Sequence, residues 1–256
     1  MLNTQIPVAY PAADDLDLRI DLGACRFEVR PGDAKGWVAG ICHDPTGERD
    51  PKIRKEGRVV TITEEKPSFD RIPDYSRGIP RYELMFGKER PFALTIDTGA
   101  SEFDLNLDGV PLKAMTVRQG PGRLNLNFSA PNPELMSLLD VSSGAASMEL
   151  ENLANANFAH MRLSGGAASY ELDFGGELSQ PAEVAIETGL SGVELTVPAS
   201  TAAKIVAETT VGSVDAGEGF TKMEGAFLTE AAMVGRKPLL TIRTGVRLGT
   251  LQIRAT

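Results

Sequence analysis

Asp97 is the residue of this chain whose sequence neighbours could best support hydrolytic chemistry. It follows an apolar run at residues 92–96 and is followed directly by Thr98 and Gly99. A carboxylate at the end of an apolar strand can activate water when a second carboxylate lies close enough to share one proton with it. Because the chain carries a single motif of this kind, a complete catalytic pair would require two chains.

The Asp-Thr-Gly triplet resembles the signature of the aspartic peptidases, and that resemblance implies peptidase activity through Asp97. Sister segments of the chain carry unlike residues at the same position before a glycine, namely Ser142, Ser164, Glu187 and Arg243. Glu187 is the one acid among them, and it lies four repeat units away. Asp97 therefore occupies a position that tolerates many side chains, and we predict a chain without catalytic residues that is not an enzyme.

Cys25, Cys42, His43 and His160 are the other residues that could bind a metal or attack a substrate. Their spacing matches no recognised set of zinc ligands, and neither histidine lies in a nucleophile setting with a serine. Two cysteines in 256 residues make no disulfide framework. The sequence thus predicts neither a metal nor a cofactor, and we interpret Cys25 as a small buried apolar residue.

The overall charge of the chain excludes some partners. The formal net charge is −9 at pH 7, whereas nucleic acids and anionic membranes are bound by clustered Lys and Arg. No stretch approaches the roughly 18 apolar residues of a membrane span, and the first residues lack the pattern of a signal peptide. The sequence therefore predicts a cytoplasmic chain with no transmembrane segment and no nucleic-acid partner.

Glycines recur along the chain at a nearly constant spacing. Most are followed four and six positions later by apolar residues that flank a polar one, as at Gly144, Met148 and Leu150. The anchors are Gly23, Gly99, Gly120, Gly144, Gly166, Gly189, Gly212 and Gly245. From Gly99 to Gly212 the intervals are 21, 24, 22, 23 and 23 residues, which indicates an internal structural repeat.

A second alternating run precedes most anchors, for example Leu94 to Ile96 and Met161 to Leu163. Alternation of period two places the apolar side chains on one face of a strand. Each unit thus reads as a strand, a glycine corner, a strand and a return loop, and stacked units would share one core. We predict an all-β, single-stranded β-solenoid with about 21–24 residues per coil; a sandwich or barrel with hairpin-connected strands is the alternative.

The corner glycines have a predicted physical role, because a sharp bend often requires a positive φ or a close backbone approach. In a solenoid the polar residues between the apolar pairs would form a file on the outer surface: Asp104, Asn125, Glu149, Glu171 and Glu194. Such a file could bind a divalent cation or a basic partner, or it could be a solvated outer face that discourages aggregation.

The regular repeat covers only part of the chain. Residues 31–92 break the period with loops rich in Pro, Gly and charge, and residues 217–237 interrupt it again. We therefore divide the chain into an N-terminal strand-and-loop cap at residues 1–92 and regular solenoid coils at residues 93–256, with an insertion near 217–237.

The glycine repeat, the run at residues 18–29 and the segment 152–158 together resemble the bacterial toast-rack proteins, which include domains of the response to cell-wall-active antibiotics and adhesin-like solenoids. That resemblance implies a β-helical stack, no catalytic residues, and a role in envelope-stress sensing or protein interaction. The function it favours is a non-catalytic scaffold that binds a protein or an envelope component. A carbohydrate-binding solenoid is a further alternative, although aromatic residues make up only 6% of the chain.

Overall fold

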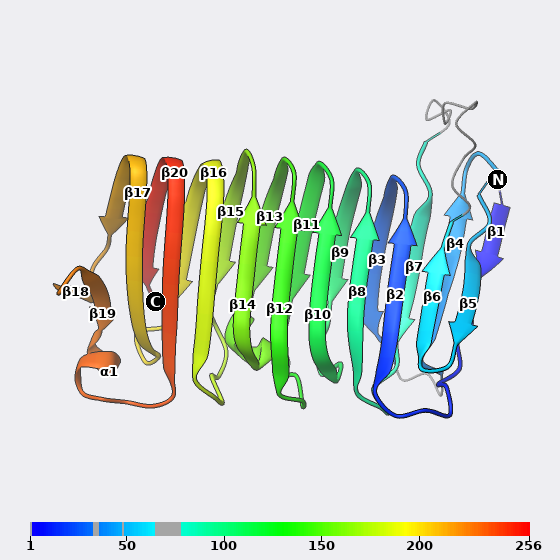
Figure 1. Cartoon of the computed structure of the whole chain (residues 1–256), viewed down its shortest axis with the longest axis horizontal. Coiled ribbons are helices and arrows are strands. Elements are labelled where there is room, and N and C mark those ends of the chain that lie inside the picture. The colour runs from blue at the N-terminus through cyan, green and yellow to red at the C-terminus, as the bar shows by residue number, and fades with distance from the viewer. Residues whose placement is uncertain (1, 33–35, 48, 65–77) are drawn as a thin grey trace.

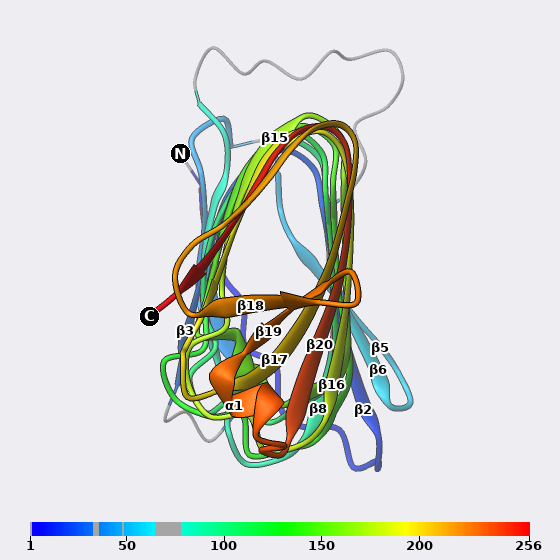
Figure 2. The ribbon, with the colours of Figure 1, turned by 90° about the vertical axis from the view of Figure 1, so that its left-hand side faces the viewer.

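The computed structural model describes residues 2–32, 36–47, 49–64 and 78–256. They form two facing walls of strands, and the chain crosses from one wall to the other at a bend in each unit (Figure 1). Figure 2 looks along the stack and shows successive units lying over one another around a flattened interior. The predicted all-β solenoid architecture is confirmed.

The first wall consists of strands that precede the bend, together with a hairpin at each end of the stack. In spatial order it contains β5 (Lys52–Glu56), β6 (Val59–Thr63), β2 (Leu16–Leu22), β8 (Phe92–Thr98), β10 (Leu112–Gln119), β12 (Met136–Ser143), β14 (Phe158–Gly165), the first halves of β16 (Ala182–Val197), β20 (Leu239–Ala255) and β17 (Ala202–Ala216), then β19 (Ala226–Thr229) and β18 (Phe220–Met223).

The second wall consists of the strands that follow the bend. Its order is β1 (Leu2–Gln5), β4 (Val38–Asp44), β7 (Arg81–Phe86), β3 (Cys25–Pro31), β9 (Ser101–Asn106), β11 (Gly122–Asn127), β13 (Ala146–Glu151), β15 (Ala168–Asp173), and the second halves of β16, β20 and β17. A short 3-10 turn (Leu153–Ala156) and the helix α1 (Glu230–Met233) are the helical elements of the described residues.

The core lies between the walls and is built from the alternating apolar positions. In the first wall Leu18, Leu94, Met115, Leu139 and Met161 face inward in register, and all are buried. Units in the middle of the stack pair in parallel, so each inward side chain lies over its counterpart in the next unit. Apolar burial that continues through the stack is what stabilises strands too short to fold alone.

The spatial order of the units departs from the chain order near both ends of the stack. The unit of β2 and β3 lies between that of β6 and β7 and that of β8 and β9. Likewise β20 lies between β16 and β17, although β17 comes first along the chain. The walls therefore run without a break across residue 92, and the division of the chain there stays an interpretation. Residues 217–237 contain β18, β19 and α1.

Six of the eight anchor glycines lie one above another at the bend, in the order Gly23, Gly99, Gly120, Gly144, Gly166 and Gly189. Close approach of neighbouring backbones explains why these positions hold glycine. The Gly120 N–H donates to Gly99 O at 3.0 Å, and a Cβ on Gly120 would lie 3.1 Å from that oxygen. The other two anchors lie outside this column. Gly245 is in register with Glu187, and Gly212 is in register with Gly249.

A positive φ occurs two positions after the anchor rather than at the anchor itself. Gly122, Gly249 and Gly212 share this second column, with φ of 154°, 144° and 150°. A Cβ on Gly122 would lie 1.8 Å from Ser101 O, and one on Gly249 would lie 1.8 Å from Ser191 O. Both the left-handed backbone and the neighbouring carbonyl therefore require glycine at these positions.

Gly122→Ala is expected to lower the free energy of unfolding by about 2–3 kcal/mol, because the added methyl strains the backbone and displaces the neighbouring strand. Gly144→Ala is the matched control, since a Cβ there would lie 3.8 Å from its nearest neighbour atom, and it is expected to cost less than about 1 kcal/mol. Urea unfolding of both variants measures the difference. Equal losses would show that the bend tolerates a side chain at both positions alike.

Candidate functional site

Asp97 lies on the outer face of the first wall, at the end of β8, and its side chain is exposed. Its register neighbours are Asp21 on one side and Arg118 on the other. The adjacent Thr98 is buried and exchanges a hydrogen bond with Ser101 across the bend, at 2.9 Å. The structure thus places a second carboxylate, Asp21, beside Asp97, a neighbour that the sequence analysis missed.

The surroundings of Asp97 differ from those of a catalytic acid pair. Asp21 is exposed as well, and the two aspartates lie on an open sheet face, where Arg118 is the register partner of Asp97 on the other side. Two carboxylates share one proton when they are held together in a site that water cannot solvate freely. Glu187 does not approach Asp97, because the register places the units of β10, β12 and β14 between them.

Cys25 and Cys42 are buried free thiols, and His43 and His160 lie on outer surfaces. Burial raises the pKa of Cys42 to about 11, although a hydrogen bond with Tyr82 opposes the shift, and burial also raises the pKa of Cys25. Both thiols therefore stay protonated at neutral pH and are poor nucleophiles. Within residues 2–32, 36–47, 49–64 and 78–256, His, Cys, Asp and Glu form no cluster suited to a metal ion.

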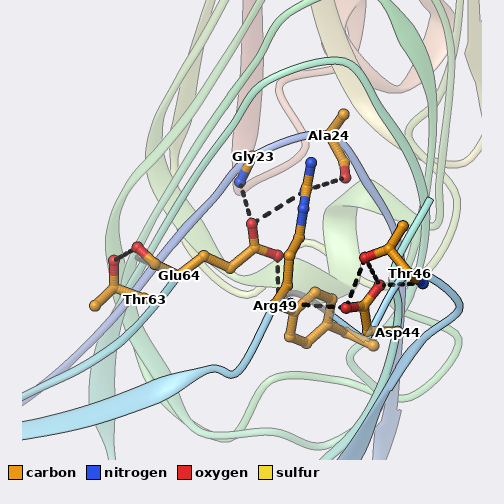
Figure 3. A network of polar contacts seen from close by, with 8 residues as sticks. Gly23, Ala24, Asp44, Thr46, Arg49, Thr63 and Glu64 are labelled. Carbon is orange, nitrogen blue, oxygen red and sulfur yellow. Dashed lines mark hydrogen bonds and ion pairs between the residues drawn. The ribbon is translucent and has the colours of Figure 1, made fainter. Parts of the chain in front are cut away.

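A buried polar network fills the place where the repeat is interrupted after β6 (Figure 3). In regular units the anchor glycine N–H donates to a neighbouring backbone carbonyl, but Gly23 N donates to the Glu64 carboxylate at 3.4 Å. Arg49 Nη1 lies 3.2 Å from the same carboxylate and 3.3 Å from Ala24 O. At this bend the side chains of Glu64 and Arg49 thus form the hydrogen bonds with the backbone that a neighbouring strand forms in regular units.

The surroundings of this ion pair hold it in place. Exposed fractions are only 14% for the Arg49 side chain and 7% for that of Glu64. The Tyr82 hydroxyl donates to the other Glu64 oxygen, while the backbone N–H of Arg49 donates to Asp44 at 2.7 Å. Burial raises the pKa of Tyr82, and the negative charge of Glu64 raises it further. We interpret the network as structural, because its polar atoms are turned toward backbone groups of the fold.

The outer file of acids predicted from the sequence is confirmed by the register of the second wall. Asp104, Asn125, Glu149, Glu171 and Glu194 are successive partners on β9, β11, β13, β15 and β16. Neighbouring strands lie about 4.8 Å apart, so like charges at this spacing repel. The file also continues to Glu28 and Glu83, which lie beyond Asp104.

The two ends of this file differ in how their charge is balanced. Arg30 bridges Glu28 and Asp104 at 3.1 and 3.0 Å, and the hydrogen bond from Arg81 lowers the pKa of Glu28. Further along lies what we name the acid surface: Glu149, Glu151, Glu171, Asp173 and Glu194. Glu194 pairs with Arg254, but the other four form no ion pair with any described residue. The acid surface is therefore the least compensated charge on this wall.

A family model supplies the relationship of this chain to known proteins. The model described as the N-terminal domain of toast_rack, DUF2154, matches residues 2–136, more than half of the 256 residues. The chain belongs to the toast-rack family.

Solved structures with a similar fold include a Clostridium sporogenes protein proposed to act in cell adhesion. It is 14% identical, has a TM-score of 0.50, and the match covers 100% of this chain and 99% of that one. Proposed adhesins of Parabacteroides merdae (10% identity, TM-score 0.43, 99% and 95% coverage) and Bacteroides fragilis (6%, 0.40, 99% and 96%) are also similar. At these identities the likeness concerns the fold. A search of curated proteins finds no match to this toast-rack chain.

Glu151 shows the electrostatic strain within the acid surface of this toast-rack chain. Partial burial raises its pKa, and the charges of Glu149 and Asp173 raise it further. A carboxyl whose pKa is higher in the folded state than in the unfolded state destabilises the fold at pH values above the folded pKa. The penalty disappears as pH falls below the unfolded pKa, where the group is protonated in both states.

Glu151→Gln is accordingly expected to raise Tm by about 1–3 °C at pH 7, because it removes this repulsion. At pH 3 the variant and the parent chain are expected to melt within about 1 °C of each other, since the carboxyl is then protonated. Thermal unfolding followed by circular dichroism at both pH values measures the effect. A variant that is destabilised at pH 7 would show that Glu151 has a favourable partner.

Proposed function

We propose that this toast-rack chain is a non-catalytic binding scaffold whose acid surface holds a positively charged partner, either a protein or an envelope component. The observation that carries the proposal is the run of carboxylates on β13 and β15 that form ion pairs with none of the described residues, beside a stretch of the same file that arginines neutralise. Uncompensated charge of one sign attracts and orients a partner of the opposite sign.

A scaffold without catalytic residues is supported by the position of the candidate acids. Asp97 and Asp21 lie on an open face beside Arg118, and the buried thiols have raised pKa values. Peptidase activity through Asp97 would appear as pepstatin-sensitive cleavage of denatured casein at acidic pH. We expect no such cleavage from the parent chain or from Asp97→Asn.

Family membership and the likeness to a protein proposed to act in adhesion support an envelope-related role. A link to envelope stress and a cytoplasmic location are both part of the proposal, and fractionation of native cells tests the location. Within the described residues, no helix has the length and apolarity to cross a bilayer. A carbohydrate-binding role has less support, because the large apolar side chains exposed on the described residues include no aromatic ring.

Binding of a fluorescent decalysine peptide at low and physiological salt tests the acid surface. The triple variant Glu149→Gln/Glu151→Gln/Glu171→Gln is expected to bind at least tenfold more weakly than the parent chain. The matched control is Glu56→Gln/Glu89→Gln/Glu183→Gln, which removes the same charge from scattered exposed positions and is expected to change affinity less than about threefold. Equal weakening in both variants would mean that only the net charge of the chain attracts the peptide.

A further inference from the structure

One side of β17 is largely without a strand partner. β20 pairs with β17 along nearly its whole length, from Ala202 to Ala216. On the opposite side β19 pairs only with Lys204, Ile205 and Val206, and no other described strand pairs with β17. Residues 207–216, which we call the β17 edge, therefore present unpaired backbone groups at the left-hand end of the stack in Figure 1.

The side chains of the β17 edge do little to prevent the addition of a further strand, whereas those of β5, at the other end of the stack, discourage it. The sequence of β5 is Lys-Ile-Arg-Lys-Glu, and charged side chains of this kind discourage pairing with a further strand. The β17 edge contains Thr, Val, Gly, Ser and Ala, with Glu208 and Asp215 as its charged residues. Unpaired backbone flanked by β-branched side chains is the usual template for strand addition.

A ridge of exposed aliphatic side chains leads to this edge. The residue after the anchor is alanine or proline in the earlier units, at positions 24, 100, 121, 145 and 167. The last three units instead place Leu190, Leu248 and Val211 in register there. Their exposed fractions are 57%, 44% and 58%, so the ridge is contiguous apolar surface that ends on the β17 edge.

The charges near the edge indicate what kind of segment it fits. A hollow of about 620 Å³ beside the ridge is lined by Glu187, Glu208 and Arg247, among others. Gly245 is in register between the two glutamates and leaves space for a side chain. The edge itself carries Glu208 and Asp215 and no cation, so pairing with the same edge of a second copy would bring four carboxylates together. A segment containing Lys or Arg would compensate them instead.

We propose that the β17 edge accepts an extended segment of a partner protein, which adds to the stack as a further strand. The segment carries aliphatic residues at alternate positions, one of which continues the ridge beyond Val211, and at least one Lys or Arg that faces Asp215 or Glu208. This proposal rests on the proposed function as a binding scaffold, but it assigns a site separate from the acid surface.

The direction of the backbone groups identifies the amides that would report the added strand. Gly217 N donates to Ile253 O of β20 at 2.9 Å. Because successive amides of a strand point to opposite sides, the N–H groups of Ala216 and Val214 point away from β20 toward the open side. A strand added there would slow hydrogen exchange at these two amides.

The experiment uses the full chain and a synthetic peptide with the sequence of residues 246–255, VRLGTLQIRA, which already pairs with β17 on its other side. The peptide combines alternating aliphatic residues with two arginines. We expect saturable binding by calorimetry and at least tenfold slower exchange at the amides of Val214 and Ala216. A scrambled peptide of the same composition is expected to bind at least tenfold more weakly.

Variants separate binding at the β17 edge from binding elsewhere on the chain. Val211→Lys is expected to weaken peptide binding at least tenfold, whereas Leu135→Lys, at an aliphatic residue 66% exposed, is expected to leave it within twofold. Glu149→Gln/Glu171→Gln is also expected to leave it within twofold. Binding lost through that acid-surface variant, equal binding of the scrambled peptide, or unchanged exchange at the two amides would overturn the proposal. Dimerisation of the chain through Val211 would overturn it as well, because the edge would then belong to a second copy.

Discussion

A chain that ends at Pro238 is expected to lose the ordered structure of β17, and a synthetic peptide of residues 239–256 is expected to restore it. β20 lies between β16 and β17, so its removal takes away the partner that β17 uses along its length. It also removes five buried apolar side chains from the core, namely Leu240, Ile242, Val246, Leu251 and Ile253. Burial of each contributes roughly 1.5–3 kcal/mol before entropic costs.

Hydrogen exchange and thermal unfolding measure this effect. In the truncated chain, amides of residues 202–216 are expected to lose protection while those of β8 to β14 keep it, because stacked repeats contact mainly their neighbours. The control is the same peptide with Ile242→Asp and Leu251→Asp, which cannot be buried and should not restore protection. Full protection of residues 202–216 in the truncated chain would show that β17 can pair with β16 directly.

Glu64→Ala is expected to lower the free energy of unfolding by about 3–5 kcal/mol, because it removes the carboxylate from a buried ion pair with Arg49. The Gly23 N–H loses its acceptor at the same time. Glu64→Gln keeps an acceptor oxygen but no charge, and it is expected to cost less than Glu64→Ala.

The surface pair of Glu194 and Arg254 supplies the matched control. Exposed fractions there are 31% and 57%, against 7% and 14% for Glu64 and Arg49. Glu194→Ala is therefore expected to cost less than about 1 kcal/mol. Urea unfolding of the three variants measures these differences. Similar losses for Glu64→Ala and Glu194→Ala would mean that the network after β6 is well solvated.

The architecture could be predicted from the sequence because two local signals agree. Alternation of apolar residues decides which side chains face the core, and the glycine spacing decides where the chain bends. Both signals hold for the units at Gly99, Gly120, Gly144, Gly166 and Gly189, which pair in the order of the chain. Each unit needs only its neighbours, so local patterns suffice to describe the middle of the stack.

The order of units near the ends could not be predicted, because every unit presents the same apolar pattern to its neighbours. Leu18 and Ile20 match Leu94 and Ile96 as well as they would match any other unit. The register of β20 could not be predicted either, for a related reason. A slip of two residues keeps every side chain on its original face, so alternation cannot distinguish Gly245 from Arg247 as the partner of Gly189. The structure pairs Thr244 with Ile186 and Val246 with Thr188.

The candidate sites also include a part that the repeat predicts and a part that it does not. The outer acid file followed from the repeat, because one polar position recurs in each unit. Its division into a neutralised and an uncompensated stretch depends on Arg30 and Arg81, which reach across strands. The pairing of Arg49 with Glu64 had no sequence signal, since both residues lie in irregular segments outside the repeat.

The position of β20 between two parallel neighbours affects how the molecule carries mechanical load. A pull on residue 256 along the second half of β20 strains its ladders to β16 and β17 together, in the direction of the strands. An edge strand pulled sideways would instead release its hydrogen bonds one after another. We therefore expect high resistance to stretching from that end of the chain, measurable as unfolding force with an optical trap.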